Sequence, residues 1–546
     1  MKYQFTQSAA EGTYVSPQQL YQITPEKSFS YGFLTEENRK TEKRLQIPEL
    51  NSGYDAVYWY RGQSITKIMQ DGDGCFVEWD GDGEIPLTFV TDVEKEGNYE
   101  VHITLTAKQD CDNALLFLGR RRLALRKAMK AGETYTGVFL ANICPVIPRT
   151  YANPMEDLTI DITVVGRGVH LKEAKVLAWS GKTLYIAGDS TVTDQSADYP
   201  YLPNASYCGW GQMISAYLGM QMAVSNHSHS GLTTESFRSE GHYDILLERI
   251  AKGDICLFQF AHNDQKLMHL MAEGGYRENL IRYIREIRER GAVPMLVTPL
   301  ARNSWKGNDG TYNDLLEPYA KECFRIGEEF DVPVLDLHRK SMEIVVSNGR
   351  EQAKAWFFPS DYTHSNDYGA YLFAGYVYEE MASQHVVEPM KELSWIPPKE
   401  LPELVIPEEF AHMENPDAER LFENLERPED EMTRAEALDM VITAMHFFPT
   451  NVYNDMFEDV IGHELYAGTV ECAYQNGLIP DEMVEDKKLC PEKKITGEEF
   501  LKVLLNGYQS RKSDAVDTAA IIPADFNPAD VMKRGAAAEI CKKLHI

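Results

Sequence analysis

The sequence contains 546 residues, of which 43% are hydrophobic and 25% charged, so it is long enough for about two to four globular domains. Its formal net charge of −30 opposes binding to nucleic-acid phosphates and to anionic lipid surfaces. The sequence has no uninterrupted run of about 18 apolar residues that would span a bilayer. We therefore expect a neutral ligand, with no nucleic acid and no membrane as partner.

The cysteines and the first residues indicate a reducing compartment. The nine cysteines are scattered, odd in number and without Cys-x-x-Cys spacing, which is typical of free thiols rather than of disulfides or a zinc site. The segment from Met1 to Ser8 lacks the apolar stretch of a secretory signal. We expect a cytoplasmic protein, and association with a cell wall is the alternative.

Residues 1–180 contain short segments in which polar and apolar side chains alternate, separated by turn residues. Examples lie at 55–60, 85–90, 99–105 and 158–164. The pattern is typical of an antiparallel β-sandwich, and we predict a jelly roll that resembles carbohydrate-binding modules. Its exposed tryptophan and tyrosine side chains would stack on sugar rings. Alternatively, this domain packs beside a catalytic cleft and shapes it without binding glycan.

Two Asp-Gly repeats lie in this region, at 71–74 and 80–83. Their carboxylates could coordinate calcium, but Asp-Gly pairs also form the commonest hairpin turns. We favour turns at both places.

From residue 181 the pattern changes to short apolar runs that alternate with amphipathic segments. The apolar runs predict strands at 183–187, 222–226, 254–260, 293–298 and 332–336. Apolar positions recurring every three or four residues predict helices at 210–218, 244–251, 277–290, 312–329 and 368–384. This alternation predicts an α/β domain over 181–390, with helices on both faces of a parallel sheet. Functional residues of such a fold gather at the carboxyl ends of the strands.

Five residues of this domain could form an acyl-transfer site. Ser190 follows the first predicted strand, where a turn would place its hydroxyl. Asp361 lies three residues before His364, so its carboxylate could orient the imidazole that removes the serine proton. The backbone amides of Ser190 and Gly231 and the side chain of Asn263 are candidate donors to a developing oxyanion. These residues predict ester hydrolysis by a Ser–His–Asp triad.

The arrangement resembles the SGNH (GDSL-type) hydrolases, whose four blocks are named for Ser, Gly, Asn and His. It is similar in detail to the rhamnogalacturonan acetylesterase group, carbohydrate esterase family twelve. The matching motifs are Gly188-Asp189-Ser190-Thr191-Val192, Gly209-Trp210-Gly211-Gln212, Gln259-Phe260-Ala261-His262-Asn263-Asp264-Gln265-Lys266 and Thr298-Pro299-Leu300-Ala301-Arg302. The resemblance covers roughly residues 181–385, and it implies a three-layer SGNH core with serine acetylesterase activity.

Two positions depart from this family pattern. Ala261 stands where the family usually has glycine, and we expect the alanine to fit. The second block reads Asn226-His227-Ser228-His229-Ser230-Gly231 in place of an arginine-bearing, glycine-rich form. Because this block would lie near the oxyanion hole and the acyl pocket, the departure bears on the identity of the sugar rather than on the type of reaction.

Three histidines, His227, His229 and His262, also suggest a metal site. However, no carboxylate lies at ligand spacing, and residues 227 and 229 of an extended segment would face opposite sides. We therefore expect no metal and no cofactor. Asp189 and Thr191, beside the predicted nucleophile, are expected to brace the turn by hydrogen bonding.

The rest of the chain divides into a linker and a helical region. Residues 391–430 are rich in Pro and Glu, which predicts a linker or a surface strap. Over 431–546, segments that begin at Met432, Ile495 and Met532 each pair a capping residue with an apolar stripe and predict three related helices. The region resembles a degenerate S-layer homology domain. That family attaches proteins to cell-wall polymers, which conflicts with the missing secretory signal, so we favour packing or homo-oligomer formation.

Together these features predict a serine O-acetylesterase that deacetylates plant cell-wall oligosaccharides, namely rhamnogalacturonan, xylan or mannan fragments. Two alternatives stay open. One is a non-catalytic glycan-binding or scaffold protein with the same fold, and the other is an esterase of a non-carbohydrate acetyl ester. No catalytic block lies in the C-terminal region, so the chemistry is expected to reside within 181–390.

Overall fold

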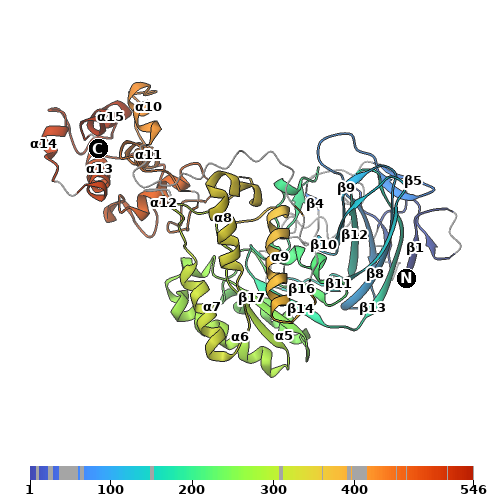
Figure 1. Cartoon of the computed structure of the whole chain (residues 1–546). Helices are drawn as coiled ribbons and strands as arrows, with labels where there is room; N and C mark the ends of the chain where they lie inside the picture. Colours follow the sequence, from blue (N-terminus) through green and yellow to red (C-terminus); the bar gives the residue numbers. More distant parts are fainter. Residues whose placement is uncertain are drawn as a thin grey trace.

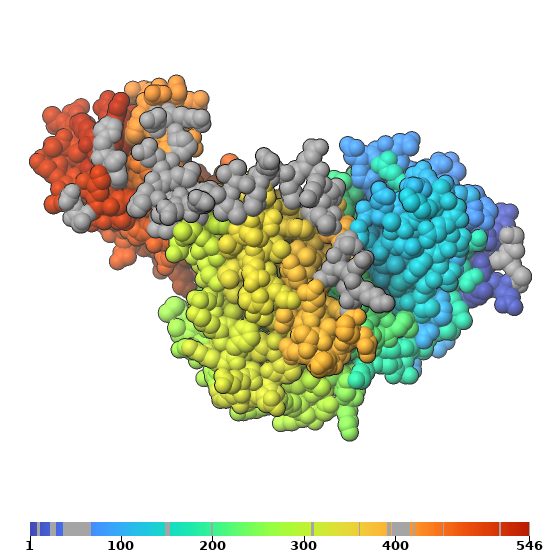
Figure 2. Space-filling view, viewed as in Figure 1, coloured from blue at the N-terminus to red at the C-terminus, as the bar shows by residue number. Residues whose placement is uncertain are grey.

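The computed structural model describes most of the chain, in three successive parts. The described residues are 1–7, 11–21, 29–35, 60–61, 67–147, 153–198, 200–306, 311–359, 361–389, 395, 415–450, 452–462, 464–512 and 515–544. Residues 55–59 of one predicted strand, and 391–394 and 396–414 of the predicted linker, lie outside this description. Figure 1 shows a part made of strands in blue and cyan, an α/β part in green and yellow, and a helical part in orange and red. The α/β part lies between the other two (Figure 2).

The N-terminal part contains two sheets. The strands of the first sheet are β1 (Lys2–Gln4), β2 (Thr13–Tyr14), β5 (Ile68–Asp71), β6 (Gly74–Val77), β8 (Gly97–Ala107), β11 (Thr134–Ile143) and β13 (Val169–Trp179). Those of the second sheet are β3 (Tyr31–Phe33), β7 (Leu87–Asp92), β9 (Cys111–Leu118), β10 (Arg122–Met129) and β12 (Thr159–Val165). The orders are β11-β8-β13-β1-β2, with β6 also pairing with β13, and β10-β9-β12-β7-β3. All these pairs are antiparallel except β1 with β2.

The apolar faces of these two sheets pack on each other. Along β8, buried Val101, Ile103 and Leu105 alternate with more exposed residues, as expected for a strand with one face in the core. The ring of Tyr3 in β1 meets the ring of Phe89 in β7 edge-on, with centroids 4.9 Å apart. The predicted strands at 85–90, 99–105 and 158–164 correspond to β7, β8 and β12, whereas the jelly-roll topology stays a prediction.

The first Asp-Gly repeat is a hairpin turn, which confirms that prediction. Asp71 pairs with Gly74 across β5 and β6, so Gly72 and Asp73 form a two-residue turn. At the second repeat, residues 81–83 form a bend that leads to Glu84, which pairs with Tyr201 of the α/β part. A short parallel pairing of β4 (Tyr60–Arg61) with β15 (Ala197–Asp198) also joins the two parts.

The α/β part is built on a parallel sheet of β14 (Thr183–Gly188), β16 (Ala223–Asn226), β17 (Ile255–Gln259), β18 (Val293–Val297) and β19 (Val334–Leu335). The strand order is β16-β14-β17-β18-β19. These strands confirm the five predicted ones. The helices of this part are α2 (Trp210–Met213), α3 (Ser215–Leu218), α4 (Ser236–Ser239), α5 (His242–Arg249), α6 (Arg277–Glu289), α7 (Glu317–Phe330), α8 (Leu337–Ala353) and α9 (Asp367–Ser383).

Both faces of the parallel sheet are covered. Leu184 and Ile186 of β14 share one apolar cluster with residues of α2, α3, α8 and α9. Tyr185 and Ala187, which point to the other face, cluster with residues of α5, α6 and α7. Figure 1 shows these three helices together on one side of the strands. Ser190 follows the carboxyl end of β14, which is the end of the parallel strands where functional sites of this type of fold lie.

Several helices of this part differ from the prediction. The helix predicted over 312–329 begins only at Glu317, as α7, and the short helix α4 was not predicted. The segment predicted as one helix over 210–218 is divided into α2 and α3 at Ile214. The helix α8 was not predicted, and its residues Ile344, Val345 and Val346 are β-branched and favour strands. Gly349 inside this helix has φ of +70°, which interrupts the helical pattern further.

The helical part contains α10 (Pro416–Glu423), α11 (Arg434–Ala444), α12 (Ala467–Gln475), α13 (Gly497–Arg511), α14 (Thr518–Ile521) and α15 (Arg534–Lys543). The helix α10 corrects the prediction of a linker up to residue 430, because Leu421 and Phe422 pack against the apolar core of this part. No helix in the described part of the chain is long and apolar enough to cross a bilayer.

The three predicted helix starts of this part lie next to one another. Thr433 and Thr496 each form a capping box, with Glu436 and Glu499 respectively. Isolated bridges join Glu431 to Lys533, Thr433 to Lys494 and Thr496 to Val531. The three related segments are confirmed as helix starts, but the predicted cap of the third is wrong, because Lys533 precedes α15 and its side chain forms no cap. The S-layer homology assignment stays a prediction.

Candidate active site

The structure brings Ser190, His364 and Asp361 together in one line of hydrogen bonds. The Oγ of Ser190 lies 2.8 Å from Nε2 of His364, and Nδ1 of His364 lies 2.7 Å from Oδ2 of Asp361. These distances suit transfer of the serine proton to an imidazole that a carboxylate orients. Ser190 is 8% exposed.

A local turn at 361–364 fixes the side chains of Asp361 and His364 relative to each other. Oδ1 of Asp361 accepts hydrogen bonds from the backbone amides of Thr363 and His364, at 2.8 and 2.9 Å, which leaves Oδ2 directed at the imidazole. Burial would raise the pKa of Asp361, but His364 and these hydrogen bonds outweigh it and lower the pKa to about 2. Asp361 is therefore ionised at neutral pH.

Asp189 and Thr191 brace the turn that carries Ser190, as predicted. Oδ1 of Asp189 accepts from the amide and the hydroxyl of Thr191, at 3.0 and 2.7 Å. The network continues through Gln259, whose Nε2 donates to Thr191 Oγ1 at 2.8 Å and whose Oε1 accepts from Trp210 Nε1 at 2.8 Å. All four side chains of this network, those of Asp189, Thr191, Trp210 and Gln259, are fully buried. The network therefore holds the turn rigidly against the core.

The segments that carry Gly231 and Asn263 lie beside this turn. The hydroxyl of Thr193 donates to the carbonyl of Ser228 at 2.6 Å, which holds the second block against the turn. Gly231 has φ of +85°, a conformation that suits glycine. The Nδ2 of Asn263 donates to the carbonyl of Leu232 at 3.0 Å. The three candidate oxyanion donors thus come from adjacent segments.

Tyr207 also belongs to this site, although it lies in none of the four sequence blocks. Its ring stacks on Phe358 with centroids 3.6 Å apart and meets the His364 ring edge-on at 5.8 Å. Its hydroxyl lies 3.4 Å from Oδ2 of Asp361. The side chain therefore borders the imidazole and the carboxylate together. Its position two residues before the Gly209-Trp210 motif was the only available signal.

The three histidines considered as metal ligands have other contacts. The Nδ1 of His262 lies 3.2 Å from Oδ2 of Asp189, and its Nε2 donates to the carbonyl of Leu300 at 2.9 Å. His227 lies 2.9 Å from the hydroxyl of Ser225, whereas the ring of His229 lies 4.9 Å from that of His242. No group of three His, Cys, Asp or Glu side chains in the described residues could hold a metal ion.

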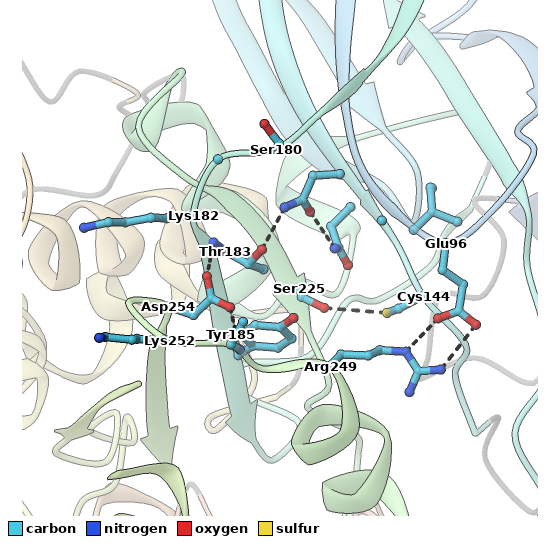
Figure 3. Close-up of a pocket in the computed structure, with 16 residues that line it drawn as sticks. Glu96, Cys144, Ser180, Lys182, Thr183, Tyr185, Ser225, Arg249, Lys252 and Asp254 are labelled. Atoms are coloured by element: carbon cyan, nitrogen blue, oxygen red, sulfur yellow. Dashed lines mark hydrogen bonds and ion pairs between the residues drawn. The ribbon is translucent and has the colours of Figure 1, made fainter. Parts of the chain in front are cut away.

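A cavity of about 560 Å³ lies elsewhere, between the N-terminal part and the α/β part. Its lining includes the ion pair of Glu96 with Arg249, together with Thr183 and Asp254 (Figure 3). Thr183 begins β14 and Asp254 directly precedes β17, so the cavity borders the amino ends of these strands. Ser190 lies at the opposite, carboxyl end of β14. It is therefore separate from the candidate active site.

Comparison with known proteins gives a consistent result for the α/β part. Residues 186–372 match the GDSL-like lipase/acylhydrolase family. The rhamnogalacturonan acetylesterase RhgT of Bacillus subtilis is 33% identical over 187 residues, which are 34% of this chain and 78% of that protein. The probable rhamnogalacturonan acetylesterase YesY of the same organism is 30% identical over 195 residues, 34% of this chain and 86% of that protein.

Among solved structures, the crystal structure of the YxiM protein from Bacillus subtilis is similar to this chain at 23% identity and a TM-score of 0.36. The similarity covers 70% of this chain and 98% of the YxiM chain.

Proposed function

The chain belongs to the GDSL-like lipase/acylhydrolase family of carboxylic ester hydrolases, and we propose that it removes acetyl groups from plant cell-wall oligosaccharides by means of Ser190, His364 and Asp361. The observation that carries the proposal is the hydrogen-bond line from Asp361 through His364 to Ser190. A protein that only binds glycan has no need for a serine, a histidine and an aspartate joined by hydrogen bonds in this way.

Each side chain has a role in the proposed reaction. Ser190 Oγ attacks the acetyl carbonyl and His364 Nε2 takes the serine proton, which it passes to the sugar oxygen as the ester bond breaks, so that the sugar leaves with a free hydroxyl. Water then attacks the acetyl-serine and gives a proton to His364, which passes it to Ser190 Oγ as the bond between this oxygen and the acetyl group breaks and acetate leaves. Asp361 stabilises the imidazolium that forms in both steps.

The proposed stabilisation of the oxyanion uses the amides of Ser190 and Gly231 and the Nδ2 of Asn263. The proximity of their segments supports this role, because preorganised donors interact more strongly with the transition state than with the ground-state carbonyl. The choice of an acetylated carbohydrate is supported by the relatives named rhamnogalacturonan acetylesterase, each similar over more than two thirds of its length.

Hydrolysis of p-nitrophenyl acetate by the wild type and by Ser190→Ala tests the mechanism. We expect a loss of about 10³-fold or more in kcat/KM for Ser190→Ala, with an unchanged circular dichroism spectrum. The matched control is Ser347→Ala, which removes a hydroxyl from the exposed surface of α8 and should keep full activity. Wild-type rates in a folded Ser190→Ala protein would rule the mechanism out.

Release of acetate from acetylated rhamnogalacturonan, xylan and mannan oligosaccharides tests the substrate. We expect at least one of these to exceed p-nitrophenyl acetate in kcat/KM, because contacts with the sugar contribute binding energy in the transition state. If p-nitrophenyl esters of long acyl chains are preferred to all of them, the carbohydrate substrate is wrong.

A further inference from the structure

We propose that the C-terminal helical part sets the geometry of the candidate oxyanion hole, because its residue Asp455 holds Lys266, and Lys266 in turn holds the side-chain amide of Asn263. This inference rests on the proposed function. Lys266 and Asp455 are then positioning residues, and Asp455 lies outside the region 181–390 to which the sequence motifs assign the chemistry.

The first contact is between Lys266 and Asn263. The Nζ of Lys266 lies 3.4 Å from Oδ1 of Asn263, while Nδ2 of the same amide donates to the carbonyl of Leu232. With an ammonium at Oδ1 and a carbonyl at Nδ2, the amide has one favourable orientation. The second hydrogen of Nδ2 is then available to an oxyanion. A cation at Oδ1 also polarises the amide and strengthens Nδ2 as a donor.

The second contact joins two parts of the chain. The Nζ of Lys266 donates to Oδ2 of Asp455, which is 189 residues away in the sequence. The Lys266 side chain is 23% exposed, so it has limited freedom to seek another partner in water. Burial lowers the pKa of Lys266, and Asp455 opposes this effect. Asp455 thus fixes both the position and the charge of the ammonium.

A second contact, between Arg302 and Asn454, fixes the helical part relative to the α/β part. The Nη1 of Arg302 donates to Oδ1 of Asn454 at 2.9 Å, and its Nη2 donates to the carbonyl of His262 at 3.1 Å. Asn454 is itself held by Glu471 of α12, which accepts from its backbone amide and its Nδ2, both at 2.9 Å. The loop at 454–455 is therefore joined to the segment 262–266 at both ends, directly at Lys266 and through Arg302 at His262.

These contacts have a catalytic consequence that differs from general stabilisation. If Asp455 and Lys266 act by orienting Asn263, removing them weakens an interaction made chiefly in the transition state. The loss must then fall on kcat and not on KM. It must also disappear once the Asn263 side chain is absent.

The experiment uses the full chain with p-nitrophenyl acetate as the probe. We expect Lys266→Met to lower kcat by about 10- to 100-fold and Asp455→Asn by about 3- to 10-fold, both less than the loss of about 10² to 10³ for removing an oxyanion donor. KM should stay within about twofold in both variants. Asp455 has φ of +53°, which aspartate and asparagine both tolerate, so Asp455→Asn removes the charge without straining the backbone.

Glu458→Gln is the matched control, since it removes one negative charge from an exposed position of the same loop. Its kcat should equal that of the wild type. In an Asn263→Ala background, Lys266→Met and Asp455→Asn should each change kcat by less than about twofold, because their target is gone. Asp455 is exposed, so its substitution leaves the core intact.

The outcomes separate this inference from the proposed function. An active wild type in which Asp455→Asn behaves like Glu458→Gln would overturn the inference and leave the proposed function standing. The same holds if the losses persist at full size in the Asn263→Ala background, or if they appear only in KM. A wild type without esterase activity would overturn both.

Discussion

Nη1 of Arg121 donates to both carboxylate oxygens of Asp367, at 2.9 and 2.7 Å, and both side chains are fully buried. Arg121 lies in the turn between β9 and β10 of the N-terminal part, with φ of +56°. Asp367 is the first residue of α9, three residues after His364. The same guanidinium donates to the carbonyls of Gln195 and Tyr207. The N-terminal part therefore holds two segments next to the candidate triad.

We predict that Arg121→Met lowers the free energy of unfolding by about 3–5 kcal/mol, because it leaves the Asp367 carboxylate buried without its cation. Burial already raises the pKa of Asp367, an effect that Arg121 opposes. The double variant Arg121→Met/Asp367→Asn should lose less than the sum of the two single variants. Chemical denaturation of the three proteins measures the difference.

Lys127→Met is the control for this prediction. It removes a cation from β10, where Lys127 forms a 3.1 Å ion pair with Glu133 at a surface position. A pair of this kind contributes about 0–1 kcal/mol. Equal losses for Arg121→Met and Lys127→Met would contradict the importance of the buried pair.

The residues of the candidate triad could be predicted from sequence because each lies in a local pattern. Ser190 follows an apolar run that forms β14, and Asp361 and His364 share one turn. The strands were predictable for the same reason, since buried parallel strands are short and continuously apolar. Their relative positions followed from the rule that such sites lie at the carboxyl ends of strands.

The residues that support the triad could not be predicted in this way. Arg121 is separated from Asp367 by 246 positions, and Lys266 from Asp455 by 189. Nothing in the local sequence of an arginine in a hairpin turn, or of an aspartate in a loop, indicates a partner in another part of the chain. Such contacts follow only from how the three parts pack.

The backbone at Ala261 explains why the family pattern usually has glycine there. Ala261 is buried with φ of +134°, a region that side chains with a Cβ rarely adopt and that costs about 1–3 kcal/mol. We predict that Ala261→Gly relieves this strain. Ala187→Gly is the control, because Ala187 is equally buried on the neighbouring strand β14 without positive φ.

Both substitutions remove one methyl group and both add the flexibility of glycine to the unfolded chain, so these costs cancel in the comparison. Ala261→Gly should therefore be more stable than Ala187→Gly by about 1–3 kcal/mol in thermal or chemical unfolding. Equal stability of the two variants would show that position 261 carries no strain.

Asp361→Asn should be more damaging than Asp361→Ala. Oδ1 of Asp361 accepts from two backbone amides, so an asparagine must keep its oxygen there and direct its NH₂ at Nδ1 of His364. Nδ1 then accepts a hydrogen bond, and the ring proton moves to Nε2, which can no longer take the proton of Ser190. We expect kcat on p-nitrophenyl acetate to fall by about 10³- to 10⁴-fold.

Asp361→Ala lets the imidazole choose its tautomer, so its loss should be at least about tenfold smaller than that of Asp361→Asn. Steady-state kinetics of the two variants at the same pH measures the ratio. If Asp361→Asn is the more active variant, the imidazole is oriented by a group other than this carboxylate.

The carboxyl group of Asp264, next to Asn263, predicts a pH-dependent stability. It is fully buried, its Oδ1 accepts from the amide and hydroxyl of Thr234, and its Oδ2 has no hydrogen-bond partner in the described residues. Burial raises the pKa of Asp264 to about 7, against an ordinary value of 3.8. The folded protein thus keeps a proton that the unfolded chain loses, so this group's contribution to stability decreases as pH rises from about 4 to 7.

The variant Asp264→Asn tests this prediction, because its side chain cannot titrate. The free energy of unfolding of the wild type minus that of the variant should therefore fall by an amount on the order of 2–4 kcal/mol between pH 4 and 8, measured by urea denaturation. A difference that stays constant over this range would show that Asp264 is ionised in the folded protein throughout.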